Sequence, residues 1–260
     1  MILDKIVVST AKRVAHSKEF IAPEKMKQKA EKYEINRDFP FKKALSKKEL
    51  SFICEVKKAS PSKSIISEDF PYIEIAENYE KYGADAVSVL TEPEFFKGDN
   101  HYLTEISEKI KLPLLRKDFI IDEYQIYEAK VIGASAVLLI CSILNEKRLS
   151  EYLKLAHSLG LSALVEVHNE DEVQKALASG AEIIGVNNRN LNDFSVDLKT
   201  SEKLRKHIPD DKIFVSESGI HTADDIKAVR EYGADAVLIG EAFMKSDNIA
   251  ELFKTFRGMI

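Results

Sequence analysis

The sequence predicts an α/β fold: a single (β/α)8 TIM barrel with an N-terminal helical extension. Three observations support this prediction. Short apolar runs alternate regularly with helical patterns, a Gly–Ala phrase recurs at similar intervals, and the length of 260 residues matches one such barrel. With 45% hydrophobic residues, the chain is also able to bury a large core.

The recurring phrase marks half of the expected strands. Each copy is a Gly–Ala pair followed by an apolar run, and the copies cover residues 82–92, 132–140, 179–188 and 232–242. Their glycines are 50, 47 and 53 positions apart: Gly83, Gly133, Gly180 and Gly233. Because glycine after a helix is a stop signal, each phrase indicates a helix that ends and a strand that begins.

Four more apolar runs lie between these phrases, at residues 51–58, 112–119, 162–168 and 212–218. Helical patterns separate all eight runs, which indicates right-handed crossovers and a parallel sheet. A doubly wound open sheet is the alternative fold. It is disfavoured because the repeat is regular throughout and no G-x-G-x-x-G follows the first strand.

The segment before the first strand, about residues 1–48, is rich in Lys and Glu. It is too polar to form core, so we interpret it as one or two amphipathic helices lying across one end of the barrel. Composition leaves open which end they cover. The whole chain, residues 1–260, is then one domain.

Composition excludes several classes of function. The net charge is −5 with both signs mixed, so no basic face for nucleic acid is expected. The N-terminus has neither a signal-peptide pattern nor an apolar span of membrane length. Cys54 and Cys141 lie in apolar runs and are expected to be reduced core thiols, which favours a cytoplasmic location. No metal site is expected, since the six histidines are scattered: His16, His101, His157, His168, His207 and His221.

Polar residues end most of the apolar runs. In a parallel barrel, alternate side chains point inward, and those at the carboxyl ends of the strands face the active-site mouth. Inner residues such as Ile53, Leu115 and Val215 would form an apolar floor below them. Taken singly, each polar residue is better explained as a solvated loop residue or as part of an ion pair. Seven of them converge here, however, which favours a functional site: Glu55, Lys57, Lys117, Glu166, Asn187, Arg189 and Glu217.

Glycines at the last two strand ends indicate a phosphate site. Ser218-Gly219 follows the seventh strand and Gly240-Glu241 the eighth, where loops of such barrels usually bind phosphate. Glycine allows close approach of backbone N–H groups to a dianion. Ser60, in the loop after the first strand, is placed to add a hydroxyl. The sequence therefore predicts a phosphorylated small-molecule substrate.

Several phrases carry a resemblance to a known family. They are EVKKASPSKS (55–64), VLTEPEFFKG (89–98), LLRKDFIID (114–122), LVEVHNEDE (164–172), IIGVNNRNL (183–191), VSESGI (215–220) and VLIGEA (237–242), in this order. With these phrases the chain resembles the indole-3-glycerol phosphate synthase family of tryptophan-pathway barrel enzymes. One departure is Ser64, where the family more often has Gly.

The resemblance implies a carboxy-lyase that cyclises 1-(2-carboxyphenylamino)-1-deoxyribulose 5-phosphate with loss of carbon dioxide and water. Lys117 would polarise or protonate the ribulose carbonyl, and Glu166 would act as the general base in the dehydration. Lys57 would lie near the substrate carboxylate, paired with Glu55. Which lysine donates which proton stays open.

The remaining expected site residues follow from the same resemblance. Asn187, Arg189 and Glu217 would orient the anilino and hydroxyl groups. The phosphate site would consist of Ser60, Ser218, Gly219, Gly240 and Glu241, and the aromatic ring would lie among Phe96, Phe119, Leu138 and Leu191. For the last four, a purely structural role explains the sequence equally well. His168 is expected to be structural or to support Glu166.

The resemblance implies no metal and no organic cofactor, and a monomer, with weak association with other tryptophan-pathway enzymes left open. Two alternative functions remain. Another phosphosugar barrel, such as a phosphoribosylanthranilate isomerase or a thiazole-phosphate synthase, would share the phosphate loops but lack the set of Glu55, Lys57, Lys117 and Glu166. A catalytically silent barrel that binds a phosphorylated ligand would have lost an acid or a base, and none is missing.

Overall fold

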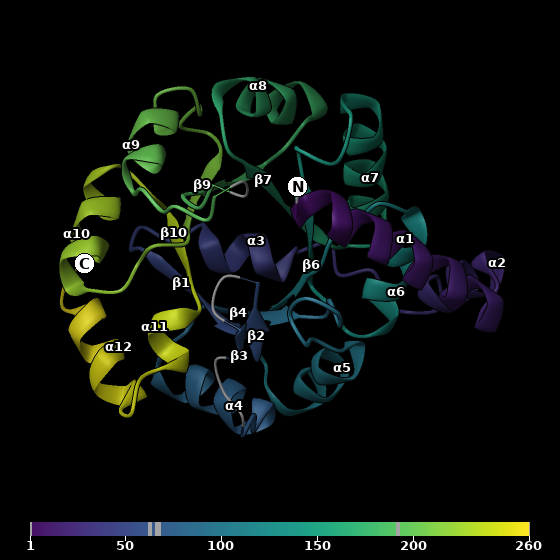
Figure 1. Ribbon diagram of the computed structural model, residues 1–260, viewed down its shortest axis with the longest axis horizontal. Helices are drawn as coiled ribbons and strands as arrows, with labels where there is room; N and C mark the ends of the chain where they lie inside the picture. The colour runs from purple at the N-terminus through teal and green to yellow at the C-terminus, as the bar shows by residue number, and fades with distance from the viewer. Residues whose placement is uncertain (1, 62–63, 66–68, 191–192, 260) are drawn as a thin grey trace.

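The computed structural model describes residues 2–61, 64–65, 69–190 and 193–259. Within these ranges, eight parallel strands close into a barrel in the order β1, β10, β9, β8, β7, β6, β5, β4 (Figure 1). The strands are β1 (Ser51–Val56), β4 (Ala86–Leu90), β5 (Leu114–Lys117), β6 (Ala136–Ile140), β7 (Ser162–Val167), β8 (Ile183–Asn187), β9 (Ile213–Glu217) and β10 (Ala236–Ile239). The predicted fold class and all eight predicted strands are confirmed.

Helices surround the barrel and connect successive strands, as Figure 1 shows. They are α4 (Tyr72–Tyr82), α5 (Asn100–Lys109), α6 (Glu123–Val131), α7 (Glu146–Ser158), α8 (Glu170–Ser179), α9 (Lys199–Arg205), α10 (Ala223–Glu231), α11 (Glu241–Met244) and α12 (Ile249–Arg257). A short antiparallel pair, β2 (Ala59–Ser60) with β3 (Ser64–Ile65), lies between β1 and α4.

Local signals fix where these helices begin and end. Side chains at the N-caps accept hydrogen bonds from backbone N–H groups of the first turn, for example Asp122 at α6 and Asn169 at α8. All four repeat glycines have positive φ, between 84° and 105°. This is the left-handed region that glycine enters without the steric penalty of a Cβ, so their predicted role as helix stops is confirmed.

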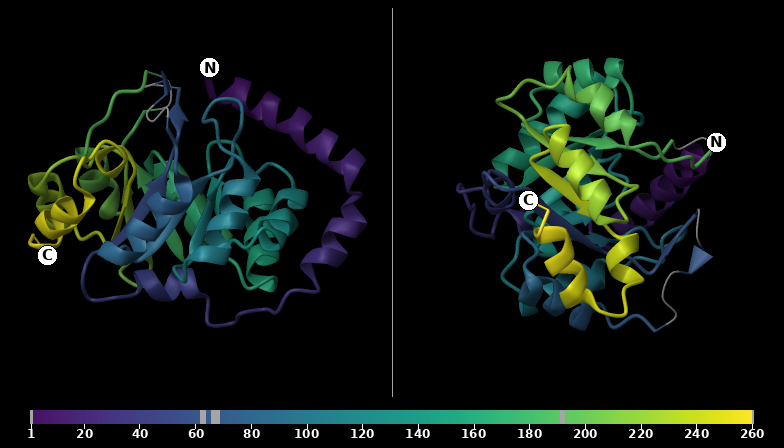
Figure 2. Two further views of the ribbon diagram at one scale, coloured as in Figure 1. Left: turned by 90° about the horizontal axis from the view of Figure 1, so that it is seen from below. Right: turned by 90° about the vertical axis from the view of Figure 1, so that its left-hand side faces the viewer.

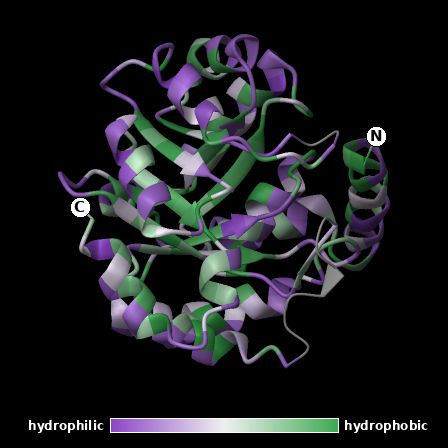
Figure 3. Cartoon of the chain, turned by 60° about the vertical axis from the view of Figure 1, so that its left-hand side comes forward, coloured by the Kyte–Doolittle hydropathy of each residue, from purple (hydrophilic) through white to green (hydrophobic). Residues whose placement is uncertain are grey.

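The strands carry two separate apolar layers. Outward-facing residues such as Phe52 and Val165 pack against the helices, whereas inward-facing residues form an inner cluster that fills the barrel. The central strands accordingly appear largely apolar in Figure 3. The inner cluster includes the residues predicted as a floor, since Ile53, Leu115, Leu164 and Val215 are all fully buried. Cys54 and Cys141 are free and buried, as expected.

The N-terminal segment differs from the prediction of one or two helices across one end. It forms three helices, α1 (Ile2–Phe20), α2 (Pro23–Ala30) and α3 (Pro40–Leu45). In Figure 2, α1 lies over one end of the barrel and α3 beneath the other. Phe41 and Leu45 of α3 are fully buried within the inner cluster, although the surrounding sequence is polar. These two apolar residues lie one helical turn apart, so they share the face of α3 that packs against the barrel bottom.

No helix among the described residues is both long and apolar enough to span a membrane. The longest, α1, carries charged residues along its length.

Candidate active site

A cavity opens at the carboxyl ends of the strands, on the side covered by α1. Fourteen predicted site residues line this cavity: Glu55, Lys57, Ser60, Phe96, Lys117, Phe119, Leu138, Glu166, Asn187, Arg189, Ser218, Gly219, Gly240 and Glu241. Glu217 is 1% exposed and is not among the lining residues. Leu191 lies outside the described residues. The tertiary structure therefore brings nearly the whole predicted set to one surface.

Two lysines and two glutamates form a chain of charges across the mouth. Lys57 Nζ donates to Glu55 Oε1 at 2.7 Å, and the other oxygen of Glu55 lies 3.7 Å from Lys117 Nζ. Lys117 Nζ is also 3.3 Å from Glu217 Oε2, which lies below it. Gly185 on β8 leaves the space for the Glu217 carboxylate, because a Cβ at that position would overlap it. Glu217 therefore contacts Lys117 from beneath.

Burial and these ion pairs set the protonation states. Burial opposes the charge of Lys117, but nearby carboxylates, first that of Glu217, outweigh it and raise the pKa of the lysine. Burial also opposes ionisation of Glu55, yet the two lysines lower its pKa. Burial, only partly offset by Lys117, raises the pKa of Glu217 to about 7. Lys117 is therefore an ammonium group between two different carboxyl groups: ionisation is favoured for Glu55 and opposed for Glu217.

Glu166 faces the cavity from the end of β7 and is 3% exposed. A neighbouring titratable group is His168, whose Nε2 lies 3.5 Å from Glu166 Oε1. The other ring nitrogen, Nδ1, is 3.2 Å from Glu172 Oε2 on α8. The carboxylate predicted as a base is therefore joined to an imidazole and a second carboxylate behind it.

Phe96, Phe119 and Leu138 give the cavity an apolar wall. The two phenyl rings lie 5.9 Å apart between centroids, tilted by 37°. The loop that carries Phe96 is held by the buried Glu92, whose Oε2 accepts the backbone N–H groups of Phe95 and Phe96 at 2.7 and 3.0 Å. Such a wall suits a flat aromatic ring, and an anionic substituent on the edge of that ring could then face the lysines.

The opposite rim is formed by the ends of β9 and β10. Ser218 and Gly219 both have positive φ, 68° and 83°, so the backbone turns sharply after Glu217. Gly240 is required for a different reason. Its φ of −114° is open to any residue, but a Cβ at this position would lie only 2.7 Å from Glu55 Oε1. Close packing at these glycines lets backbone groups form this part of the surface.

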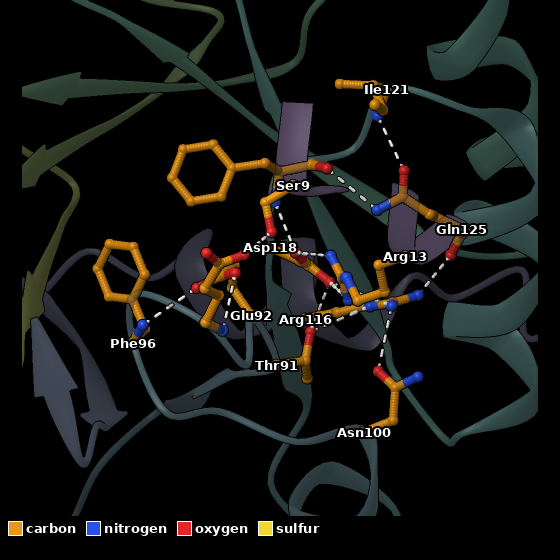
Figure 4. Close-up of polar contacts among 12 residues, drawn as sticks. Ser9, Arg13, Thr91, Glu92, Phe96, Asn100, Arg116, Asp118, Ile121 and Gln125 are labelled. Atoms are coloured by element: carbon orange, nitrogen blue, oxygen red, sulfur yellow. Dashed lines mark hydrogen bonds and ion pairs between the residues drawn. The ribbon is translucent and has the colours of Figure 1, made fainter. Parts of the chain in front are cut away.

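Sequence reasoning missed the contribution of α1. Ile2, Leu3 and Ile6 line the cavity from above. A bidentate ion pair holds this helix in place, with Arg13 Nη1 and Nη2 at 3.0 and 2.7 Å from the two oxygens of Asp118 (Figure 4). An Arg and an Asp 105 positions apart carry no local signal of pairing. Only the adjacency of Asp118 to Lys117 could have drawn attention to it.

Asp118 is itself fixed from the barrel side. Thr91 Oγ1 donates to it at 2.9 Å and Arg116 Nη2 at 3.2 Å (Figure 4). Arg116 is fully buried and also binds Glu128 Oε2 at 2.6 Å. Charged hydrogen bonds of this kind are strong and directional. The strand end that presents Lys117 is therefore anchored on both sides.

Three comparisons with known proteins bear on this site. The family model for indole-3-glycerol phosphate synthase matches residues 3–256. A relative of that name from Ruminiclostridium cellulolyticum is 56% identical over 98% of this chain and 98% of its own. Another, from Endomicrobium trichonymphae, is 57% identical over 99% of this chain and 100% of its own.

Solved structures agree on the fold. A 3-hexulose-6-phosphate synthase aligns with a TM-score of 0.65 and 17% identity, covering 81% of this chain and 100% of its own. The corresponding enzyme from Salmonella typhimurium aligns with a TM-score of 0.67 and 14% identity, over 81% and 98% of the two chains. At this identity the likeness concerns the barrel alone. The family model and the two named relatives, in contrast, match nearly the whole sequence, the relatives at more than half of the aligned positions. The chain therefore belongs to the indole-3-glycerol phosphate synthase family.

Proposed function

We propose that Lys117 and Glu166 are the general acid and general base of this enzyme and that the rest of the mouth positions the substrate. The enzyme is a carboxy-lyase of tryptophan biosynthesis that forms indole-3-glycerol phosphate. Its substrate, 1-(2-carboxyphenylamino)-1-deoxyribulose 5-phosphate, loses carbon dioxide and water as the ring closes. The observation that carries the proposal is the contact of Lys117 with Glu217 and Glu55 above an apolar floor.

The first step is attack of the carboxylate-bearing ring carbon on the ribulose carbonyl. Lys117 donates a proton to the carbonyl oxygen as negative charge develops there. The carboxylates around Lys117 keep it charged before the step, and the low dielectric of the site strengthens its attraction for the developing oxyanion. Carbon dioxide then leaves, which restores the aromatic ring.

The second step is dehydration, in which Glu166 removes a proton from the substrate and the hydroxyl leaves as water with a proton from one of the two lysines, Lys57 or Lys117. Its position on β7, two strands away from Lys117 on β5, lets the two groups act on different parts of one substrate. Asn187 and Arg189 from the end of β8 line the same side and orient the anilino and hydroxyl groups. Glu217 acts through Lys117, because it lies beneath that lysine.

The two ends of the substrate bind in different surroundings. Lys57 attracts the substrate carboxylate until it leaves, and Glu55 holds Lys57 in place. The phosphate binds between Ser60, Ser218, Gly219, Gly240 and Glu241, with the backbone as the main donor. Phe96, Phe119 and Leu138 enclose the aromatic ring.

We also propose that the chain acts as a cytoplasmic monomer without metal or cofactor. Two free, buried cysteines suit a reducing compartment. A catalytically silent phosphate-binding barrel would have lost an acid or a base, whereas Lys117 and Glu166 are both present.

The test is an assay of the purified chain with synthetic substrate, following the fluorescence of the indole product. Glu166→Gln is expected to lower turnover by about 10²-fold, the scale for removing a positioned base. The matched control is Glu182→Gln, which replaces a half-exposed glutamate paired with Lys42 at the other end of the barrel. Near-normal turnover of Glu166→Gln at saturating substrate would show that Glu166 is not the base.

A further inference from the structure

The turn after β9, which we call the phosphate turn, consists of Ser218, Gly219 and Ile220. All three residues line the active-site cavity. Ser218 and Gly219 have positive φ, 68° and 83°. A residue with a Cβ, such as Ser218, rarely enters this left-handed region unless contacts with its neighbours hold it there. The shape of the phosphate turn therefore depends on groups outside the turn itself.

Asn188, directly after β8, contacts the phosphate turn from behind. Its side-chain Nδ2 donates to the carbonyl oxygen of Ser218 at 3.1 Å, and its backbone N–H donates to the carbonyl oxygen of Glu217 at 2.9 Å. In an extended chain, successive carbonyl groups point to opposite sides. Both carbonyls face one residue here because the backbone turns at Ser218. Asn188 thus holds two consecutive peptide groups at the end of β9.

The remaining contacts of Asn188 fix the orientation of its side-chain amide. Oδ1 accepts the backbone N–H of Ser201 at 3.0 Å and the hydroxyl of the same residue at 2.8 Å. Nδ2 also donates to Ser216 Oγ at 3.0 Å. Since a backbone N–H only donates, the amide oxygen must face Ser201 on α9 and the NH2 group must face the phosphate turn. Asn188, Ser201 and Ser216 are all buried, so water competes little for these contacts.

This arrangement directs the Gly219 N–H towards the cavity. The peptide bond between Ser218 and Gly219 is trans, which places its C=O and N–H groups on opposite sides. Asn188 binds the carbonyl from a hollow beside the cavity; the described lining of the cavity includes Gly219 but not Asn188. No backbone carbonyl of the described residues accepts the Gly219 N–H. This N–H is therefore available to an anion in the cavity.

We propose that Asn188 is a positioning residue for substrate binding: it holds the Ser218 carbonyl on one side of the phosphate turn and thereby aims the Gly219 N–H at the substrate phosphate on the other. This inference rests on the proposed phosphate site. Asn188 itself touches neither the phosphate nor the reacting atoms. Backbone N–H groups of a turn form an anion site only while their peptide groups keep this orientation.

A purely structural asparagine at this position would need only its contacts to Ser201. Those contacts secure α9 against the end of β8, and they use the amide oxygen alone. They do not account for the NH2 group that is directed at the Ser218 carbonyl. That contact stabilises the one residue of the phosphate turn that has both a Cβ and a positive φ. The two ends of the amide therefore have separate tasks.

The experiment compares wild-type protein, Asn188→Ala and Ser201→Ala in KM, kcat, competitive inhibition by inorganic phosphate and urea unfolding. Asn188→Ala is expected to raise KM and the phosphate inhibition constant about tenfold, the scale of a hydrogen bond to a charged group. The substitution introduces no charge that would itself repel phosphate. The kcat should change little, because phosphate contacts are present in both the ground state and the transition state.

Ser201→Ala is the matched control. It removes a buried hydroxyl that donates to the same amide, but it leaves the contact between Asn188 and Ser218 in place. It should lower the urea midpoint and leave KM and the phosphate inhibition constant unchanged. An unchanged inhibition constant in folded Asn188→Ala contradicts the proposal. An equal rise in Ser201→Ala also contradicts it, because the effect would then be a general loosening of the buried network.

Nuclear magnetic resonance of the isotope-labelled wild type gives a second readout that requires no variant to fold. Titration with inorganic phosphate should shift the Gly219 N–H downfield, because this group donates to the anion. The side-chain N–H of Asn188 should shift as well, since hydrogen bonds in one chain polarise one another. The side-chain amide of Asn145, which caps α7, is the control and should not shift. A shift of Gly219 without a shift of the Asn188 side chain contradicts the proposal.

Gly219→Ala separates failure of this inference from failure of the proposed phosphate site. If phosphate inhibits Gly219→Ala as strongly as the wild type and leaves the wild-type Gly219 N–H unshifted, the phosphate binds elsewhere and both proposals are wrong. If Gly219→Ala binds phosphate weakly while Asn188→Ala binds it normally, the phosphate site stands and only the role of Asn188 is wrong.

Discussion

Helices of one N-terminal segment cover both ends of this barrel, and they are attached in different ways. At the closed end, α3 inserts Phe41 and Leu45 into the inner cluster, where both are fully buried. At the mouth, ion pairs join α1 to the barrel, Arg13 to Asp118 and Lys18 to Asp122, beside an apolar contact of Val14 with Met26 and Tyr124. Its apolar residues Ile2, Leu3 and Ile6 line the cavity.

The difference shows how a barrel separates stability from function. Apolar contacts gain free energy by filling space, so they suit an end where nothing has to bind. Directional ion pairs hold a helix at a distance and leave volume beneath it. The same division predicts that changes at the mouth alter rate and binding, whereas changes at the closed end alter stability.

The largest effect is expected for Lys117→Ala. Removing the proposed acid should lower turnover by about 10³-fold, or about 4 kcal/mol of barrier. The fold should persist, because the pKa of Glu217 is already raised to about 7 and this carboxyl group can become neutral when its lysine partner is removed. The fluorescence of the indole product measures turnover, and a urea unfolding curve measures stability. Turnover within tenfold of the wild type would remove Lys117 from the mechanism.

Leu45→Ala tests the closed end. Deleting a fully buried leucine from the inner cluster should destabilise the protein by about 3 kcal/mol. Turnover per folded molecule should stay close to that of the wild type, since α3 lies at the end opposite the cavity. Urea unfolding and an assay at a temperature where the variant is folded provide the comparison. A fall in turnover of the folded protein would show that the two ends are coupled.

Arg13→Met tests the attachment of α1. It removes two hydrogen bonds to Asp118, which keeps Arg116 and Thr91 as partners, so the expected loss is about 2 kcal/mol. KM should rise because Ile2, Leu3 and Ile6 are less well placed over the cavity. Lys18→Met removes a second, more exposed ion pair between α1 and the barrel and should have a smaller effect. Equal KM values in both variants would exclude a specific role for Arg13.

The smallest effect concerns the phosphate site. Gly219→Ala places a Cβ at φ +83° and 2.5 Å from Val196 Cγ1, which should raise KM about tenfold and weaken inhibition by inorganic phosphate. Gly83→Ala is the matched control: its φ is +105°, but no atom lies within 4 Å. Both should lose stability, and only Gly219→Ala should change the phosphate inhibition constant. Unchanged inhibition in Gly219→Ala would place the phosphate elsewhere.

We prefer Gly219 to Gly240 for this purpose. A Cβ at Gly240 would lie 2.7 Å from Glu55 Oε1 and 3.0 Å from Lys57 Nζ, so substitution there would disturb the charged groups as well as the phosphate.

The sequence by itself determined the strands, the helix ends and the residues at the mouth. These features depend on short-range rules: glycines that stop helices, and alternation of side chains that places residues such as Lys117 and Glu166 inward at strand ends. In a closed parallel barrel all such ends meet at one place, so position within each strand was enough to identify the shared surface.

Only the tertiary structure decided how these groups pair and what covers them. It placed Glu217 beneath Lys117 rather than on the cavity surface, directed His168 at Glu166, and laid α1 over the mouth through Arg13 and Asp118. Each of these contacts joins residues from different elements, or depends on a side-chain rotamer. The physical reason is that charge pairing and helix docking depend on three-dimensional distance, which the local periodicity of a sequence does not encode.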